Sequence, residues 1–280
     1  MRRELEGRAA LITGASAGIG EAAAQALAKR GCSLILAARR LDLLQALAER
    51  LGSGTQAVPC LPVQLDVTDL STIQRAVEIG IGRFGQIDVL VNNAGVGRLD
   101  WLDQMDPGEG IERQIRVNLI GLAQMTRAVL PSMLSRHEGH IINVGSIASL
   151  IGSPTYSIYA ASKFGVRGFS EALRREVAGF GVRVSVIYPG AVRTGFAGDA
   201  VARRKTRITT PGWLVLTPEG VGEAIAGLAV HPRRSLVLPW VMRPLAWANA
   251  LVPGLIDWLV VRAFVRRERS QVRGTPRQAP

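Results

Sequence analysis

Two residues four positions apart, Tyr159 and Lys163, form the clearest chemical pair in the sequence. In a helix they lie one turn apart on the same face. A free phenol has a pKa of about 10, too high for a base at neutral pH, and a nearby ammonium lowers it by Coulomb attraction. Ser146 follows a predicted strand and can donate a hydrogen bond to a substrate oxygen as negative charge develops there. Together the three side chains predict proton transfer at a carbonyl or alcohol oxygen.

A glycine-rich turn separates the first predicted strand from the first predicted helix. It reads Thr13-Gly14-Ala15-Ser16-Ala17-Gly18-Ile19-Gly20. Glycines let the backbone turn tightly and approach a ligand closely, and the free N–H groups and dipole of the following helix attract an anion. The turn therefore predicts a site for the pyrophosphate of a dinucleotide, with an ordinary tight turn as the alternative.

Two adjacent arginines, Arg39 and Arg40, follow the second predicted strand. A site that prefers NAD usually places an acid at this strand end to bind the ribose 2′-hydroxyl, whereas an arginine accommodates the 2′-phosphate of NADP. No acid is present here, and Arg39 can offer a planar fork to a phosphate, with Ser16 and Arg40 as additional donors. The sequence therefore favours NADP(H) over NAD(H), although two adjacent arginines in a loop are often only solvated.

Short runs rich in Val, Ile and Leu alternate with longer segments of helical spacing. The runs are continuously apolar, as strands covered on both faces are. The predicted strands are 9–13, 33–38, 58–65, 88–91, 140–144, 183–188 and 235–238, and the predicted helices are 20–30, 41–51, 70–82, 111–136, 156–179 and 218–230. This order predicts an α/β fold, a Rossmann-type doubly wound parallel sheet of about seven strands with helices on both faces.

The composition excludes several classes of protein. The 280 residues are 48% hydrophobic and 20% charged, which is unlike a disordered chain or a small disulfide-stapled protein. Cys32 and Cys60 lie far apart in the chain and predict no disulfide, so we expect a reduced, cytoplasmic setting. The three histidines have no acidic or cysteine companions at ligand spacing, and we expect no metal site.

The net charge of +12 is concentrated near the end of the chain, because residues 262–280 contain six arginines and one glutamate. Such a tail could bind nucleic acid. However, it has no interleaved aromatic residues beyond Phe264, and the chain has no recognition module. We therefore expect no nucleic-acid partner.

The chain divides into two parts. Residues 1–235 show no repeat or linker and predict one dinucleotide-binding catalytic domain, and residues 236–280 predict a C-terminal apolar helical extension with a basic tail. Proline, glycine and charged residues leave no uninterrupted apolar stretch of ~20 residues, so we expect two short amphipathic helices over 244–251 and 254–266. We favour packing over the substrate pocket or in a homo-oligomer interface. The alternative is peripheral membrane contact, with the arginines on anionic headgroups.

In their order, these motifs resemble those of the short-chain dehydrogenase/reductase family. The resemblance covers about residues 8–195 and rests on the glycine-rich turn, Asp66-Val67, Asn92-Asn93-Ala94-Gly95, Asn118, Ser146, Tyr159 with Lys163, Pro189-Gly190 and Thr194. Taken singly, several of these have plainer explanations. Asn118 in a helix is more often solvated or associated with a kink, Asn92-Asn93 can be only a turn, and Pro189-Gly190 only a strand stop.

The resemblance implies a role for each matched residue. Catalysis falls to Ser146, Tyr159, Lys163 and Asn118, with Asn118 holding a water that relays protons through Lys163. Tyr156 is read as a substrate-side or packing residue. The predicted cofactor-binding residues are Gly14, Ser16, Gly18, Ile19 and Gly20 in the turn, Arg39 at the 2′-phosphate, Asp66 and Val67 against adenine, Asn93, Ala94 and Gly95 along the adenosine ribose, Tyr159 and Lys163, and Pro189, Gly190 and Thr194 near the nicotinamide.

We therefore expect an NADP(H)-dependent oxidoreductase that interconverts a carbonyl and an alcohol on a fairly apolar small molecule. Lowering the pKa of Tyr159 to about 7 takes roughly 4 kcal/mol. We expect Lys163 and the positive nicotinamide of the oxidised cofactor to supply it. The alternatives are a cofactor-binding scaffold or sensor with little turnover, and the same chemistry with NAD(H).

Overall fold

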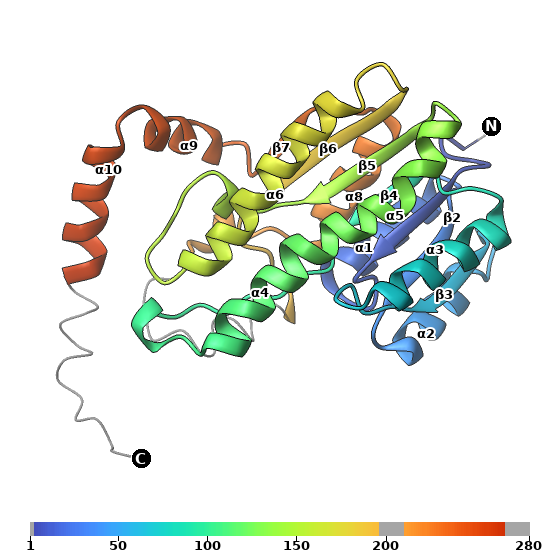
Figure 1. Ribbon diagram of the computed structural model, residues 1–280, viewed down its shortest axis with the longest axis horizontal. Helices are drawn as coiled ribbons and strands as arrows, with labels where there is room; N and C mark the ends of the chain where they lie inside the picture. Colours follow the sequence, from blue (N-terminus) through green and yellow to red (C-terminus); the bar gives the residue numbers. More distant parts are fainter. Residues whose placement is uncertain (1–2, 196–209, 267–280) are drawn as a thin grey trace, which may run out of the picture.

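Seven parallel strands form one central sheet in the computed structural model, which describes residues 3–195 and 210–266 (Figure 1). From edge to edge the strands are β3 (Cys60–Gln64), β2 (Ser33–Ala38), β1 (Ala9–Thr13), β4 (Val89–Asn92), β5 (Gly139–Val144), β6 (Val182–Pro189) and β7 (Ser235–Leu238). The chain winds outward from β1 to β3, then crosses to β4 on the other side of β1. This is the predicted doubly wound order, and its switch point lies at the carboxyl ends of β1 and β4.

Helices cover both faces of the sheet (Figure 1). Successive residues of β1 point to opposite sides: Leu11 packs in the core formed with α3, α5 and α6, and Ile12 in the core formed with α1, α2 and α8. Both faces are therefore dry, which explains the continuously apolar strands. The helices are α1 (Gly18–Lys29), α2 (Leu41–Leu51), α3 (Leu70–Phe84), α5 (Leu122–Ser135), α6 (Ser157–Glu176) and α8 (Pro218–Val230), with short 3-10 turns η1 (Leu102–Gln104), η4 (Ile147–Ser149) and η5 (Gly212–Leu214).

The prediction of one continuous helix over residues 111–136 is wrong, because the segment is divided into several helical elements. The segment begins at Pro107 with the π-helical η2 (Pro107–Glu112), passes through α4 (Arg113–Ile115) and the π-helical η3 (Arg116–Gly121), and becomes regular only in α5. Close packing accompanies the irregular turn at η3, because a Cβ on Gly121 would lie only 2.7 Å from the Val67 carbonyl oxygen. The sequence pattern could not reveal this contact, since it comes from a distant loop.

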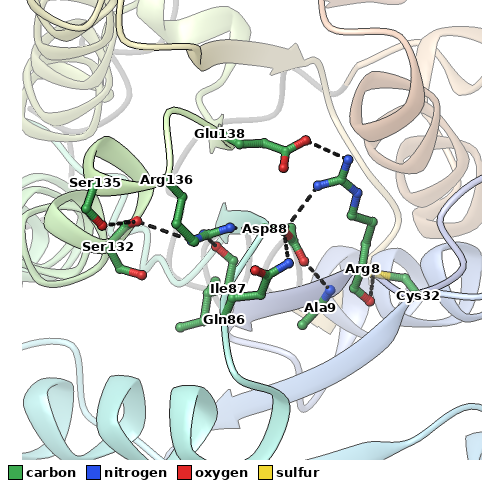
Figure 2. Close-up of polar contacts among 10 residues, drawn as sticks. All are labelled: Arg8, Ala9, Cys32, Gln86, Ile87, Asp88, Ser132, Ser135, Arg136 and Glu138. Carbon is green, nitrogen blue, oxygen red and sulfur yellow. Dashed lines mark hydrogen bonds and ion pairs between the residues drawn. The ribbon is translucent and has the colours of Figure 1, made fainter.

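Five predicted elements have the observed bounds, and apart from the divided helix the boundaries of the other elements up to β7 shift by at most three residues. The fourth strand begins at Val89 and not at Asp88. The Asp88 side chain joins several neighbouring elements. Its Oδ2 accepts the Ala9 N–H at 2.8 Å, and its Oδ1 lies 3.2 Å from Arg8 and 3.4 Å from Arg136 (Figure 2). This buried carboxylate joins the amino ends of β1 and β4 to the end of α5, at the edge of the sheet opposite the glycine-rich turn.

Beyond β7 the structure has two short helices, α9 (Met242–Leu251) and α10 (Pro253–Val260), and α10 continues as the π-helical η6 (Val261–Val265). They begin two and one residues before the predicted starts. Within the described residues no single helix is long and apolar enough to cross a membrane. The pair meets that length and composition only together, and it is bent by 110° at the break. The tail beyond residue 266 lies outside the described residues.

Candidate active site

The glycine-rich turn is built against the loop after β4. Gly14 has a φ of +68° and Gly18 of +60°, which side-chain-bearing residues rarely adopt. A Cβ on Gly20 would lie 2.2 Å from the Gly14 carbonyl oxygen, so a larger residue cannot fit. Asn93 Nδ2 donates to the carbonyl oxygens of Thr13 and Gly14 at 3.0 and 3.2 Å. The amide of Asn93 therefore holds the shape of the turn.

Thr13 makes the reciprocal contact, and the sequence reading missed its role. Its Oγ1 accepts the backbone N–H groups of Asn93 and Ala94, both at 3.0 Å. The hydroxyl thus connects the carboxyl ends of β1 and β4, on the two sides of the switch point. The only sequence signal was its place immediately before Gly14.

The start of α1 fits an anion. Its preceding residue, Ala17, makes no side-chain hydrogen bond to the first N–H groups of the helix. Those donors and the positive end of the helix dipole are available to a pyrophosphate. Ile19 is half-buried in the first turn, and Thr194 lies against Gly18, where a Cβ would meet Thr194 Cγ2 at 3.1 Å. The loop after β6 therefore reaches the phosphate end of the predicted cofactor site.

Arg39 and Arg40 are both exposed at the end of β2. Arg40 Nη2 donates to Ser16 Oγ at 3.1 Å, so its guanidinium lies at the glycine-rich turn. The Arg39 backbone carbonyl accepts a hydrogen bond from Gln64 Nε2 at 3.2 Å. Arg40 therefore makes the contact that joins this loop to the glycine-rich turn. The sequence predicts Arg39 as the main ligand of the 2′-phosphate and Arg40 as an additional donor.

Asp66 and Val67 lie after β3. Asp66 Oδ1 accepts from the N–H and hydroxyl of Thr68 at 2.9 and 2.7 Å, which fixes the turn into α3. Val67 is buried and packs on Gly121 in η3. On the opposite flank, Gly190 continues from Pro189 at the end of β6, and its N–H donates to the Leu238 carbonyl oxygen at 2.7 Å. These residues border the carboxyl edge of the sheet from opposite sides.

Asn118 is buried in the π-helical turn η3, not solvated. Its Oδ1 accepts the Val96 N–H at 2.8 Å, and its Nδ2 donates to the Val96 carbonyl oxygen at 2.9 Å and to Ser162 Oγ at 3.1 Å. π-Helical turns are frequent at functional sites. The side chain therefore holds the loop after β4 against α6.

Gly95 lies between Asn118 and Lys163. A Cβ at this position would be 3.3 Å from Asn118 Oδ1 and 3.8 Å from Lys163 Nζ. The loop after β4, η3 and α6 thus converge at one place, and they bring together residues that are far apart in the sequence.

Tyr159 and Lys163 are both buried on the first turns of α6. Lys163 Nζ lies 5.9 Å from the centroid of the Tyr159 ring and donates to the Val144 carbonyl oxygen at 3.0 Å. That carbonyl belongs to the end of β5, two residues before Ser146, and the sequence contained no sign of its contact. Ser146 precedes η4, and its Oγ accepts the Ala148 N–H at 3.1 Å.

Burial dominates the electrostatics of this pair. It raises the pKa of Tyr159 to about 12, while a hydrogen bond with Ser146 acts in the opposite direction. Burial also lowers the pKa of Lys163 to about 8. The expected fall in the tyrosine pKa is therefore absent from the protein alone, because the cost of removing the charged phenolate from water exceeds the help it receives.

The surroundings of Tyr159 are apolar. Leu99, Ala148 and Ala160 form a small buried cluster with it, and Tyr156 packs against the cluster with its ring edge-on to Tyr159 at 6.2 Å. This position agrees with the reading of Tyr156 as a packing or substrate-side residue. Thr155, which the sequence reading missed, is buried with a φ of +69° and no hydrogen-bond partner for Oγ1. Such strain in a non-glycine residue is typical of functional loops.

The described residues contain no group of three or more His, Cys, Asp or Glu side chains that could hold a metal ion. The groups that gather at the carboxyl edge are a phenol, an ammonium, a hydroxyl, an amide and a helix start. They suit an anionic dinucleotide and a proton-transfer step.

Comparisons with known proteins agree with this geometry. The family model described as short chain dehydrogenase matches residues 8–205. The 3-oxoacyl-(acyl-carrier-protein) reductase FabG of Escherichia coli is 39% identical over 189 residues, which cover 68% of this chain and 75% of that protein.

Two solved structures are similar over most of their length. A short-chain dehydrogenase/reductase from Burkholderia phymatum in complex with NAD has a TM-score of 0.79 and 27% identity, covering 90% of this chain and 96% of that one. An alcohol dehydrogenase from the archaeon Thermococcus sibiricus, complexed with 5-hydroxy-NADP, has a TM-score of 0.73 and 32% identity, covering 82% and 95%.

Proposed function

The chain belongs to the short-chain dehydrogenase/reductase family of oxidoreductases, and on that premise we propose that it interconverts a carbonyl and an alcohol on a fairly apolar substrate, with NADP(H) as the cofactor. The observation that carries the proposal is the buried arrangement of Tyr159 beside Lys163, with Ser146 hydrogen-bonded to the phenol. A structural tyrosine does not need a buried cation and a serine hydroxyl as neighbours.

Tyr159 is the proton donor in the reductive direction. With a pKa of about 12 its phenol is fully protonated at neutral pH and can give its proton to the carbonyl oxygen. Ser146 donates a hydrogen bond to the same oxygen as negative charge develops there. When bound, the reduced dinucleotide supplies the hydride to the carbonyl carbon.

Lys163 supports the phenolate that Tyr159 becomes. Its ammonium is held by the Val144 carbonyl oxygen, and a pKa of about 8 leaves it mainly charged at pH 7. In the oxidative direction the same charge, together with the positive nicotinamide ring, lowers the cost of deprotonating Tyr159. Asn118 is a positioning residue on this reading: its amide fixes the loop of Val96 and Gly95 next to Lys163, where a proton-relaying water would be held.

The residues at the turn fit a dinucleotide. The uncapped start of α1 and the close packing at Gly14 and Gly20 form a backbone cradle that a Cβ would fill. The choice of NADP(H) is supported by this chain's own residues, since Arg39 and Arg40 follow β2 and no acid stands at its end. The hydrogen bond from Arg40 to Ser16 supports the proposal, because it holds a guanidinium at the glycine-rich turn, where a 2′-phosphate would bind.

A fairly apolar substrate is supported by Leu99, Ala148 and Tyr156 around the phenol. FabG, whose name describes a 3-oxoacyl substrate, is one relative of that character. We also propose a cytoplasmic location. Its support is that Cys32 and Cys60 are free thiols and form no disulfide with each other.

The test is a panel of ketones, aldehydes and secondary alcohols with NADPH, NADH and their oxidised forms, followed by absorbance of the reduced nicotinamide. We expect turnover on apolar carbonyls with NADPH preferred. Binding of the cofactor without turnover on any member of a broad panel would instead favour the scaffold or sensor alternative.

A further inference from the structure

The two helices beyond β7 expose apolar side chains that the rest of the chain does not cover. Trp247 is 61% exposed, Leu251 81% and Trp258 57%, and Ala246 is the only described residue of α9 or α10 that is buried. Figure 1 shows α10 standing apart from both helix layers. We name the set of exposed side chains Trp240, Trp247, Leu251, Leu255, Trp258 and Leu259 the C-terminal apolar surface. A patch of this kind on a folded chain indicates a partner.

Arginines border the C-terminal apolar surface. The Arg243 guanidinium lies 5.5 Å from the centroid of the Trp247 ring, and that of Arg262 lies 5.6 Å from the Trp258 ring. From residue 242 to the end, the sequence has seven arginines, two acidic residues and no lysine. Tryptophan beside arginine suits the boundary between acyl chains and anionic headgroups, where the ring is half-immersed and the cation meets phosphate.

The geometry favours helices that lie on a bilayer. The 10 residues of α9 are about 15 Å long, half the ~30 Å of a hydrocarbon core, and α10 turns away by 110°. Neither helix can span alone, and the bent pair does not form one straight rod.

The segment that carries the C-terminal apolar surface begins at the carboxyl edge of the sheet, where the candidate active site also lies. Leu238, the last residue of β7, pairs with Pro189 at the carboxyl end of β6, and α9 begins four residues later. Ser146 follows β5 at the same edge. Figure 1 shows α9 and α10 beyond this end of the strands.

We propose that α9 and α10 dock the protein on an anionic lipid bilayer, with the carboxyl edge of the sheet turned toward the membrane. A second copy of the chain is the weaker occupant, because two such surfaces face to face would bring the same arginines together. A bilayer of anionic lipid can bury the tryptophan rings at its interface and bind the arginines through its headgroups.

The test uses the full chain in co-sedimentation with vesicles of phosphatidylcholine alone or of phosphatidylcholine with phosphatidylserine. We expect binding to the anionic vesicles that falls at least 10-fold in the Arg243→Glu/Arg262→Glu variant, because each arginine contributes to headgroup attraction. Arg75→Glu/Arg127→Glu changes the net charge equally on exposed parts of α3 and α5, and it should bind within about 2-fold of the unmodified protein.

A tryptophan pair gives an independent result. Trp247→Ser/Trp258→Ser should also lose binding, while Trp213→Ser, at an exposed tryptophan outside the surface, should keep it. Equal losses in test and control variants would overturn the proposal. So would vesicle binding unaffected by the Trp247/Trp258 pair when the same pair dissociates an oligomer in sedimentation velocity. Tyr159→Phe should bind vesicles normally, which separates this proposal from that of the enzymatic function.

Discussion

Lys163 Nζ lies 5.9 Å from the centre of the Tyr159 ring, with both side chains buried on adjacent turns of α6. The ammonium does not point freely into a cleft, because the Val144 carbonyl oxygen at the end of β5 accepts a hydrogen bond from it. One main-chain oxygen of the sheet therefore sets the distance between cation and phenol. The ammonium lies where it can stabilise a phenolate. Tyr159 is nevertheless protonated at neutral pH, because burial raises its pKa to about 12.

Tyr159→Phe should remove turnover and preserve cofactor binding. General acids contribute about 10²–10⁴-fold to a rate, so we expect a loss of kcat of that order in NADPH-dependent carbonyl reduction. The matched control is Tyr156→Phe, which keeps the edge-on ring beside Tyr159 and should change kcat by less than about 10-fold. Equal losses in the two variants would assign the effect to packing.

Lys163 should titrate at a pH of about 8 in the free enzyme, because burial disfavours its charged form. The chain has only three lysines, so ¹³C-dimethyl-lysine NMR with Lys163→Met as the assignment control can follow it directly. In carbonyl reduction, kcat/KM for NADPH, which reports groups of the free enzyme, should fall as the pH rises through this value and the ammonium is lost. In Lys163→Arg the positive charge persists at high pH, so any residual activity should not show this fall with rising pH. An ordinary lysine titration above pH 10 would contradict the prediction.

Arg39 and Arg40 should decide the coenzyme preference. A charge-assisted hydrogen bond contributes about 1.5–3 kcal/mol, so Arg40→Ala should raise KM for NADPH by roughly 10–100-fold and leave that for NADH nearly unchanged. Arg39→Asp should reverse the preference, because an acid after β2 binds a ribose hydroxyl and repels a phosphate. Arg75→Ala on α3 is the control and should alter neither constant. A preference for NADPH that survives both changes at β2 would contradict this assignment.

Asn118→Ala should cost both stability and rate. The partly buried Val96 N–H and carbonyl would lose their side-chain partner, which costs up to about 1–3 kcal/mol for a group left fully unsatisfied. Urea unfolding should show a lower free energy of unfolding, and kcat should fall more than KM rises. Asn118→Asp can still accept a hydrogen bond from the Val96 N–H. Its free energy of unfolding and its kcat should lie between those of the unmodified protein and those of Asn118→Ala. If Asn118→Ala lost rate with unchanged stability, the side chain would act on the reaction and not through the loop.

His140 should make the protein less stable in mild acid. Burial, with a smaller contribution from Arg183, lowers its pKa from 6.5 to about 4, and its Nε2 lies 2.8 Å from Ser185 Oγ. Between these pH values the unfolded chain binds a proton that the folded protein does not, so the free energy of unfolding falls as the pH falls. The contribution is complete above pH 6.5 and is lost by about pH 4, with a total on the order of 3 kcal/mol.

Urea unfolding from pH 7 to pH 4 measures this effect. His140→Gln should show a shallower pH dependence than the unmodified protein, whereas the exposed His231→Gln should match the unmodified protein. Parallel curves for all three proteins would show that His140 is not the group responsible.

Local pattern was enough for most of the helices and strands. Each apolar run of four to eight residues became a strand because both faces of the sheet are covered, as Leu11 and Ile12 illustrate. Tyr159 and Lys163 share a face because a helix has 3.6 residues per turn, and the turn at Gly14 needs glycine whatever follows it. Spacing and residue type carry such information without any distant contact.

Tertiary structure alone decided the irregular helix at Asn118, the contact of Arg40 with Ser16 and the role of Asp88. It also raises the pKa of Tyr159 in the protein alone, because desolvation depends on every neighbour that the fold gathers around Tyr159 and spacing reports only one of them. The predicted fall in this pKa required the positive nicotinamide of the oxidised cofactor as well. Sequence thus determined which groups are present and which share an element, whereas packing between distant segments decided their partners, their burial and their charge.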